Sequence, residues 1–126
     1  MIGYVTLGTR DLARAGAFYD ALCAEFGVKR MMEEETFIAW GEPGGGAGIG
    51  LTKPFDGEPA TVGNGVMVAF EAKSPAEVDR IYAKAMELGA TDEGAPGPRT
   101  EGFYAGYFRD PDGNKLNVFH MSFPES

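Results

Sequence analysis

One pattern occurs twice in this chain, at a spacing of about 63 residues, and this repeat constrains the fold more than any other feature. Each copy has a strand-like segment, a capped amphipathic helix, a glycine that ends the helix and three further strand-like segments. Three pairs of residues mark the equivalence: Tyr4 and Met67, and Asp11 and Ser74, each 63 positions apart, and Gly27 and Gly89, 62 positions apart. A repeat at a fixed period indicates a duplicated structural unit, here of the form βαβββ.

The two helices are indicated by their caps and by apolar periodicity. Asp11 is a favourable N-cap, and the apolar residues after it recur on one helical face until Gly27. In the second copy Ser74 is the N-cap, Pro75 occupies the first helical position and Glu77 completes a capping box.

Eight segments have the β-branched and aromatic content, or the alternation, of strands. They are Ile2–Gly8, Val28–Glu34, Thr36–Gly41, Ala47–Lys53, Gly65–Glu71, Ala90–Ala95, Phe103–Arg109 and Lys115–Phe119. Pro54–Gly63 is typical of a linker, and Gly94–Gly102 of a flexible loop. We predict one α+β domain, 1–126, in which tandem βαβββ modules, 1–53 and 64–121, form a curved mixed sheet around a cleft. Since each helix can cover only one face of its sheet, we expect the functional pocket at the other faces.

The last two strands are joined by a tight turn, Asp110–Asn114. Pro111 sets φ at the second turn position, and Asp110 can bond the backbone two residues on. Gly113 supplies a positive φ, which Asn114 would also tolerate.

The charge and cysteine content limit the classes of partner. A net charge of −8 argues against nucleic acid, whose phosphates need clustered Lys and Arg. It is compatible with a neutral or cationic small ligand, or simply with a soluble acidic surface. The single cysteine, Cys23, excludes an intrachain disulfide and favours a cytoplasmic setting. No stretch is typical of a bilayer span or a secretory signal.

Two motifs resemble those of the vicinal oxygen chelate superfamily, which includes glyoxalase I, bleomycin-resistance proteins and extradiol dioxygenases. Tyr4–Leu12 followed by Ala17–Tyr19 resembles the family's "His-Val-x-Leu-x-x-x-Asp-Leu … Phe-Tyr". Arg109–Leu116 resembles "Arg-Asp-Pro-Asp-Gly-Asn-x-x-Glu". The resemblance covers nearly the whole chain and implies the paired βαβββ fold, a cleft-bound small molecule and a homodimer.

The resemblance also implies positions for metal ligands. At these positions the chain has residues that differ from the family's His and Glu ligands. Tyr4 stands at the first-strand His position, Met67 at its equivalent in the second unit and Asn117 at the last-strand Glu position. The counterpart in the fourth strand of the first unit lies near Gly50. We therefore expect no metal cofactor, because these residues would make a weak divalent site.

Other residues have two possible roles, one functional and one structural. His120 lies an odd number of positions from Asn117, so we expect it on the opposite face, in a structural or solvent-facing role. Cys23 falls in the helix stripe and is expected to pack as a small hydrophobe. Glu33–Glu35 could attract a cation or form a solvated turn. Arg109 could clamp an anion, but we expect a surface ion pair with Asp110 or Asp112.

Four aromatic residues are candidates for either a ligand pocket or the core: Trp40, Phe103, Tyr104 and Tyr107. With Tyr4, Met67 and Asn117 they form the predicted ligand-binding set. We predict a metal-free, glyoxalase/bleomycin-resistance-like protein that binds a small organic molecule in the cleft. The alternatives are a metal-dependent lyase, isomerase or dioxygenase of the same superfamily, and an interaction module without a small ligand.

Overall fold

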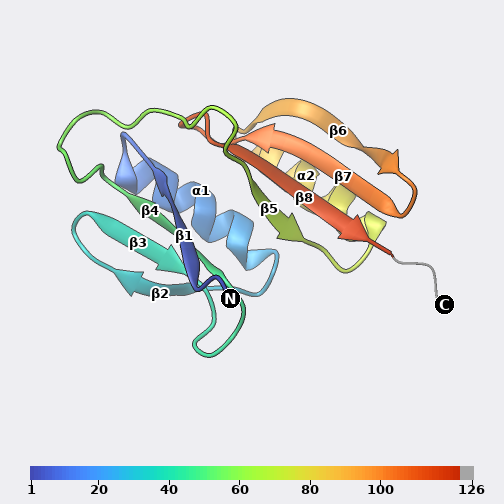
Figure 1. The fold of residues 1–126 in the computed structure, drawn as a ribbon, viewed down its shortest axis with the longest axis horizontal. Helices are drawn as coiled ribbons and strands as arrows, with labels where there is room; N and C mark the ends of the chain where they lie inside the picture. Colours follow the sequence, from blue (N-terminus) through green and yellow to red (C-terminus); the bar gives the residue numbers. More distant parts are fainter. Residues whose placement is uncertain (123–126) are drawn as a thin grey trace. The chain divides into compact units, whose positions relative to one another are not determined.

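The structure is a computed structural model that describes residues 1–122 of the chain. The chain divides into two compact units between Gly63 and Asn64. Each unit has one helix and a four-stranded mixed sheet in the order βαβββ (Figure 1). The α+β class and the duplicated βαβββ unit are therefore confirmed.

In the first unit the elements are β1 (Tyr4–Gly8), α1 (Leu12–Ala24), β2 (Arg30–Glu33), β3 (Phe37–Trp40) and β4 (Gly48–Thr52). The strands lie in the order β1-β4-β3-β2, with β1 and β4 parallel. Asp11 caps α1 as expected, its carboxylate accepting a 3.0 Å hydrogen bond from the Arg14 amide. The helix buries its apolar stripe, including Phe18, Tyr19 and Leu22, against the sheet.

The second unit repeats this arrangement with β5 (Val68–Glu71), α2 (Pro75–Glu87), β6 (Thr91–Thr100), β7 (Phe103–Arg109) and β8 (Lys115–Met121). The strand order is β5-β8-β7-β6, with β5 and β8 parallel. Ser74 caps α2, accepting a 3.1 Å hydrogen bond from the Glu77 amide. The Glu77 carboxylate accepts from the Lys73 amide at 3.4 Å, one residue before the predicted partner.

Two predicted boundaries in the second unit were wrong. Gly94–Gly102 is not a loop, because β6 continues to Thr100 through shifts in its register with β7. The prolines are tolerated because β6 is the edge strand of its sheet and its register with β7 shifts next to them. Strand β5 begins at Val68 rather than Gly65, whose φ of 92° belongs to a turn.

The turn between β7 and β8 has the predicted chemistry. Asp110 accepts hydrogen bonds of 2.9 Å from the amides of Asp112 and Asn114, and one of 3.0 Å from the Asn114 side chain. Gly113 has a φ of 93°. Within residues 1–122, neither helix has the length and apolar content needed to cross a membrane.

Candidate functional site

In the second unit α2 covers one face of the sheet. Tyr82 of α2 contacts the ring of Phe108, and Tyr104 donates a 2.7 Å hydrogen bond to an aspartate of the same helix. Side chains alternate along a strand, so Tyr107 points to the face opposite α2. Asn117 pairs with Tyr107 in the β7–β8 ladder and therefore points the same way. We call this side of the sheet the face opposite α2.

Asn117 is the most unusual residue on the face opposite α2. It is only 1% exposed, and neither its side-chain nitrogen nor its oxygen has a hydrogen-bond partner among the described residues. A buried amide without partners loses its bonds to water and gains none in return, at a cost of about 1–3 kcal/mol for each unsatisfied group. Such a cost at a single position, in a sheet that is otherwise well paired, marks Asn117 as a candidate site residue.

The neighbours of Asn117 on this face are aromatic and cationic. The ring of Tyr107 lies 5.4 Å from the guanidinium carbon of Arg99 and 5.6 Å from the ammonium nitrogen of Lys115. Farther along the same strands, the rings of Phe103 and Phe119 stack with centroids 5.6 Å apart. The face therefore has an aromatic end, a central amide and a cationic end.

The equivalent position in the first unit is Gly50. Thr6 pairs with Gly50 between β1 and β4, just as Ala69 pairs with Asn117 between β5 and β8. Thr6 and Ala69 are 63 positions apart, so the register settles the alignment that the sequence leaves loose. A Cβ on Gly50 would lie 2.7 Å from the ring of Phe37, which occupies the space over this glycine. The first unit therefore presents no functional side chain at this position.

The residues at the positions that the resemblance assigns to metal ligands do not fit a divalent ion. Tyr4 offers a phenol, Met67 a thioether and Asn117 an amide. The fourth position, Gly50, has no side chain. None supplies the imidazole or carboxylate that such an ion prefers. Across residues 1–122, no group of three or more His, Cys, Asp or Glu side chains is arranged to hold a metal.

The other predicted site residues are described within their own units. Trp40 is 1% exposed in the core of the first unit, where its indole donates a 2.8 Å hydrogen bond to Asp20. Tyr104 lies on the α2 side of its sheet, away from Asn117. Tyr4 is exposed and contacts the edge of Phe37, while Met67 is exposed and precedes β5. Phe103 and Tyr107 lie on the face of Asn117.

Two residues for which the sequence left alternative roles have structural ones. His120 pairs with Tyr104, so it lies on the α2 side as expected, with Nδ1 3.2 Å from the Ala72 carbonyl oxygen. Cys23 is buried, and burial, helped by the charge of Asp20, raises the pKa of its thiol to about 12, which leaves it unreactive.

The predicted ion pair of Arg109 with Asp110 or Asp112 was wrong. Arg109 pairs instead with Glu93 on the neighbouring strand and donates a 2.7 Å hydrogen bond to the Gly113 carbonyl oxygen. The carboxylate of Asp110 is already committed to the turn, where it accepts from backbone amides.

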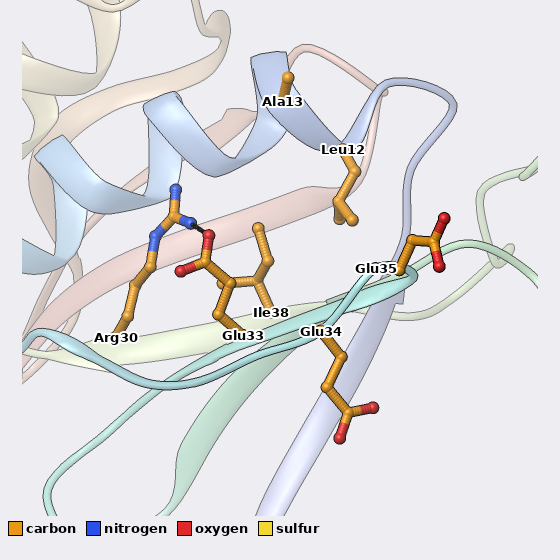
Figure 2. A pocket seen from close by; sticks show the side chains of 7 residues that line it. All are labelled: Leu12, Ala13, Arg30, Glu33, Glu34, Glu35 and Ile38. Carbon is orange, nitrogen blue, oxygen red and sulfur yellow. Dashed lines mark hydrogen bonds and ion pairs between the residues drawn. The ribbon is translucent and has the colours of Figure 1, made fainter.

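A shallow hollow of about 440 Å³ lies in the first unit between α1 and the β2–β3 hairpin (Figure 2). Figure 2 shows Leu12 and Ile38 between the helix and the hairpin, with Glu34 and Glu35 directed away. Its cation, Arg30, is paired with Asp20 and with Glu33, at 2.8 and 2.7 Å. The hollow thus offers a ligand a few apolar side chains and exposed carboxylates. Glu34 and Glu35 lie in the exposed turn, whereas Glu33 ends β2 and pairs with Arg30.

Sequence reasoning missed Arg99 and Lys115. Lys115 precedes Asn117 by two residues, so strand alternation alone places both on one face. Arg99 could not be placed, because the segment that contains it was predicted to be a loop. Its approach to Tyr107 depends on the irregular register of β6.

Two four-stranded sheets, each built from one βαβββ unit, define the class of paired βαβββ proteins. A family model described as the Glyoxalase/Bleomycin resistance protein/Dioxygenase superfamily matches residues 1–118. The chain belongs to this superfamily. No match was found among curated proteins.

Solved structures give the same result. The chain is similar to a glyoxalase/bleomycin resistance protein from Albidiferax ferrireducens T118, with 36% identity, 97% of this chain and 99% of that chain covered, and a TM-score of 0.88. It is also similar to a lactoylglutathione lyase from Agrobacterium tumefaciens, with 25% identity, coverage of 95% and 92%, and a TM-score of 0.72. A glyoxalase/bleomycin resistance protein/dioxygenase family enzyme from Burkholderia phytofirmans PsJN, at 21% identity, coverage of 95% and 98% and a TM-score of 0.77, shares the fold.

Proposed function

We propose that this chain is a glyoxalase/bleomycin-resistance-like binding protein that holds a small organic molecule without a divalent metal ion. The ligand lies on the face opposite α2 in the second unit, against Asn117, Tyr107 and Phe103. The observation that supports this proposal most directly is the buried, unpartnered amide of Asn117. It occupies the position at which the family resemblance implies a metal-binding carboxylate.

The physical argument concerns the cost of that amide. An amide can donate two hydrogen bonds and accept two, so Asn117 has a large unused capacity. A ligand with a carbonyl, carboxylate or hydroxyl group would supply partners and recover part of the desolvation cost. Tyr107 and Phe103 are half-buried, and an apolar ligand body can pack against the parts of their rings that stay exposed.

Access to Asn117 requires a movement of neighbouring side chains. The amide atoms are closed to water. Lys115 lies two residues earlier on the same face and is half-buried, with a flexible four-carbon stem. We propose that movement of this stem is what admits a polar ligand atom to the amide.

A metal-dependent lyase, isomerase or dioxygenase is the second candidate. The similarity to a protein described as a lactoylglutathione lyase favours it. This function would require metal ligands other than the four residues at the family positions, because those residues lack imidazole and carboxylate groups. An interaction module without a small ligand is the third candidate.

Metal analysis and ligand binding together test the proposal. Protein purified without chelator is expected to hold far less than one transition-metal ion per chain and to keep its melting temperature in EDTA. Asn117→Ala is expected to weaken ligand binding at least tenfold while leaving the fold intact. Tyr104→Phe, on the other side of the same sheet, is the matched control and should bind normally. One tightly held metal ion per chain would instead favour the enzyme.

The homodimer implied by the family resemblance and the cytoplasmic location suggested by the single cysteine stay predictions. Light scattering on the purified protein tests the first, and cell fractionation tests the second.

A further inference from the structure

We infer that the ligand carries a carboxylate group, which Arg99 and Lys115 hold beside Asn117. This inference rests on the function proposed above and adds the chemical class of the ligand. It is carried by two cations that flank one aromatic ring and have no carboxylate partner within residues 1–122.

The two cations are engaged only weakly by the protein. Arg99 donates a 2.6 Å hydrogen bond to the Ala95 carbonyl oxygen, and both cations lie near the face of Tyr107. In contrast, Arg109 on the same sheet is neutralised by Glu93, and Lys84 of α2 lies 3.8 Å from Glu87. The contacts with Tyr107 leave the charges of both cations available to an anion.

Two neighbouring cations without a carboxylate partner among the described residues are unexpected in a chain of this composition. Asp and Glu outnumber Lys and Arg by 19 to 11, so carboxylates are available for surface ion pairs. The net charge alone would favour a neutral or cationic ligand. The local charges are different: Arg99 and Lys115 lie 5.4 and 5.6 Å from the ring of Tyr107, and the Arg109–Glu93 ion pair on the same sheet adds no net charge.

The order of side chains along the sheet indicates the shape of the ligand. Every second side chain of β8 points to the same face, so this face carries Phe119, Asn117 and Lys115 in a row. Successive side chains in the row are about 7 Å apart. Phe103 stacks on Phe119 at the aromatic end. A molecule with an aromatic or apolar body and a carboxylate at one end therefore matches the face, with Asn117 between the two parts.

The donors that this face offers to an anion are side chains. Protein phosphate sites draw on helix N-termini and loops, whose backbone N–H groups are free to donate. On this sheet the backbone groups of β7 and β8 are used in the ladder, which leaves side-chain donors only. A planar carboxylate can be met by the guanidinium fork of Arg99, by Lys115 and by the Asn117 amide.

Three probes with the same phenylpropyl body separate the inference from the proposed function. They are 3-phenylpropanoate, its primary amide and 3-phenylpropylammonium. Binding is measured on the full chain by titration of backbone amide signals in NMR spectra at low ionic strength. We expect the carboxylate to bind at least tenfold more tightly than the amide, the ammonium to bind most weakly, and the perturbed signals to include Asn117.

Arg99→Gln combined with Lys115→Gln should abolish the preference, so that 3-phenylpropanoate binds no more tightly than its amide does to the same variant. Lys73→Gln combined with Lys84→Gln makes the same change in net charge at α2 and should retain the preference. If the first double variant does not fold, Lys115→Gln alone and the salt dependence of binding serve instead, and loss of the preference in high salt is expected.

The outcomes distinguish the two claims. Equal affinity for the carboxylate and the amide, with Asn117 perturbed by both, overturns the carboxylate inference and leaves the proposed function standing. A preference that survives loss of both cations also overturns the inference. If no probe perturbs Asn117 or its neighbours, both the inference and the proposed function are wrong.

Discussion

The two units share one framework, but they differ in what they hold on the face opposite the helix. In the first unit Asp20, Arg30 and Trp40 form a complete network on the α1 side, with bonds of 2.8 Å. The corresponding position on the other face is Gly50, under the ring of Phe37. In the second unit the face opposite α2 instead holds Asn117, buried and without a partner. The two units thus share their framework, while the buried amide without hydrogen-bond partners lies in the second unit.

The largest expected difference between the units is at the turns before their last strands. Asp110→Ala removes an acceptor for three hydrogen bonds in a buried turn and should cost about 3 kcal/mol of unfolding free energy. Glu42→Ala, in the exposed connection between β3 and β4, should change it by less than about 0.5 kcal/mol. Urea unfolding of both variants provides the measurement. Equal costs would mean that the two turns contribute alike.

A smaller effect is expected from the glycines of the same turns. Gly113→Val should cost about 1–2 kcal/mol, because a β-branched residue is strained at a φ of 93°. Gly46→Val is the control, since Gly46 lacks a positive φ and an added Cβ there would meet open space. An unchanged melting temperature for Gly113→Val would contradict the turn geometry.

The parts of the fold that could be predicted from sequence are those with local causes. The caps at Asp11 and Ser74 and the Asp110–Asn114 turn depend on residues within a few positions of each other, and the repeat revealed their equivalence. The full length of β6 could not be predicted, because Pro96 and Pro98 are tolerated only by an edge strand, and edge position is a property of the whole sheet.

The candidate site shows the same division. The resemblance drew attention to Asn117, but its lack of a partner depends on every side chain around it. Trp40 seemed an equally good pocket residue in sequence, and only its bond to Asp20 across the unit shows that it belongs to the core. The partner of Arg109 was missed for a related reason, because Glu93 lies on a neighbouring strand.

The polar network of the first unit predicts a modest dependence of stability on pH. The hydrogen bond from Arg30, with help from Trp40 and the charge of Arg30, holds the pKa of the Asp20 carboxyl below its usual value. A lowered pKa in the folded state stabilises the fold above the unfolded value of about 3.9, and this contribution is lost as pH falls through the folded value. Because Asp20 is partly exposed, the effect should be below about 1 kcal/mol.

Asp20→Asn tests this dependence. The variant should be less stable than the parent at pH 7, and its stability should fall less steeply between pH 5 and pH 2. Unfolding free energies across that range provide the measurement. Parallel pH profiles for the two proteins would show that Asp20 contributes nothing to acid sensitivity.

The most direct test of the account replaces Asn117 by a side chain of similar size without polar atoms. Asn117→Leu removes an unsatisfied amide, so the free energy of unfolding should stay constant or rise by up to about 1 kcal/mol. Binding of 3-phenylpropanoate and its amide should be lost in the same protein. Asn114→Leu is the matched control: Asn114 is also buried but bonded to Asp110, so its loss should destabilise the fold. Normal binding by Asn117→Leu, together with a clear loss of stability, would contradict the account.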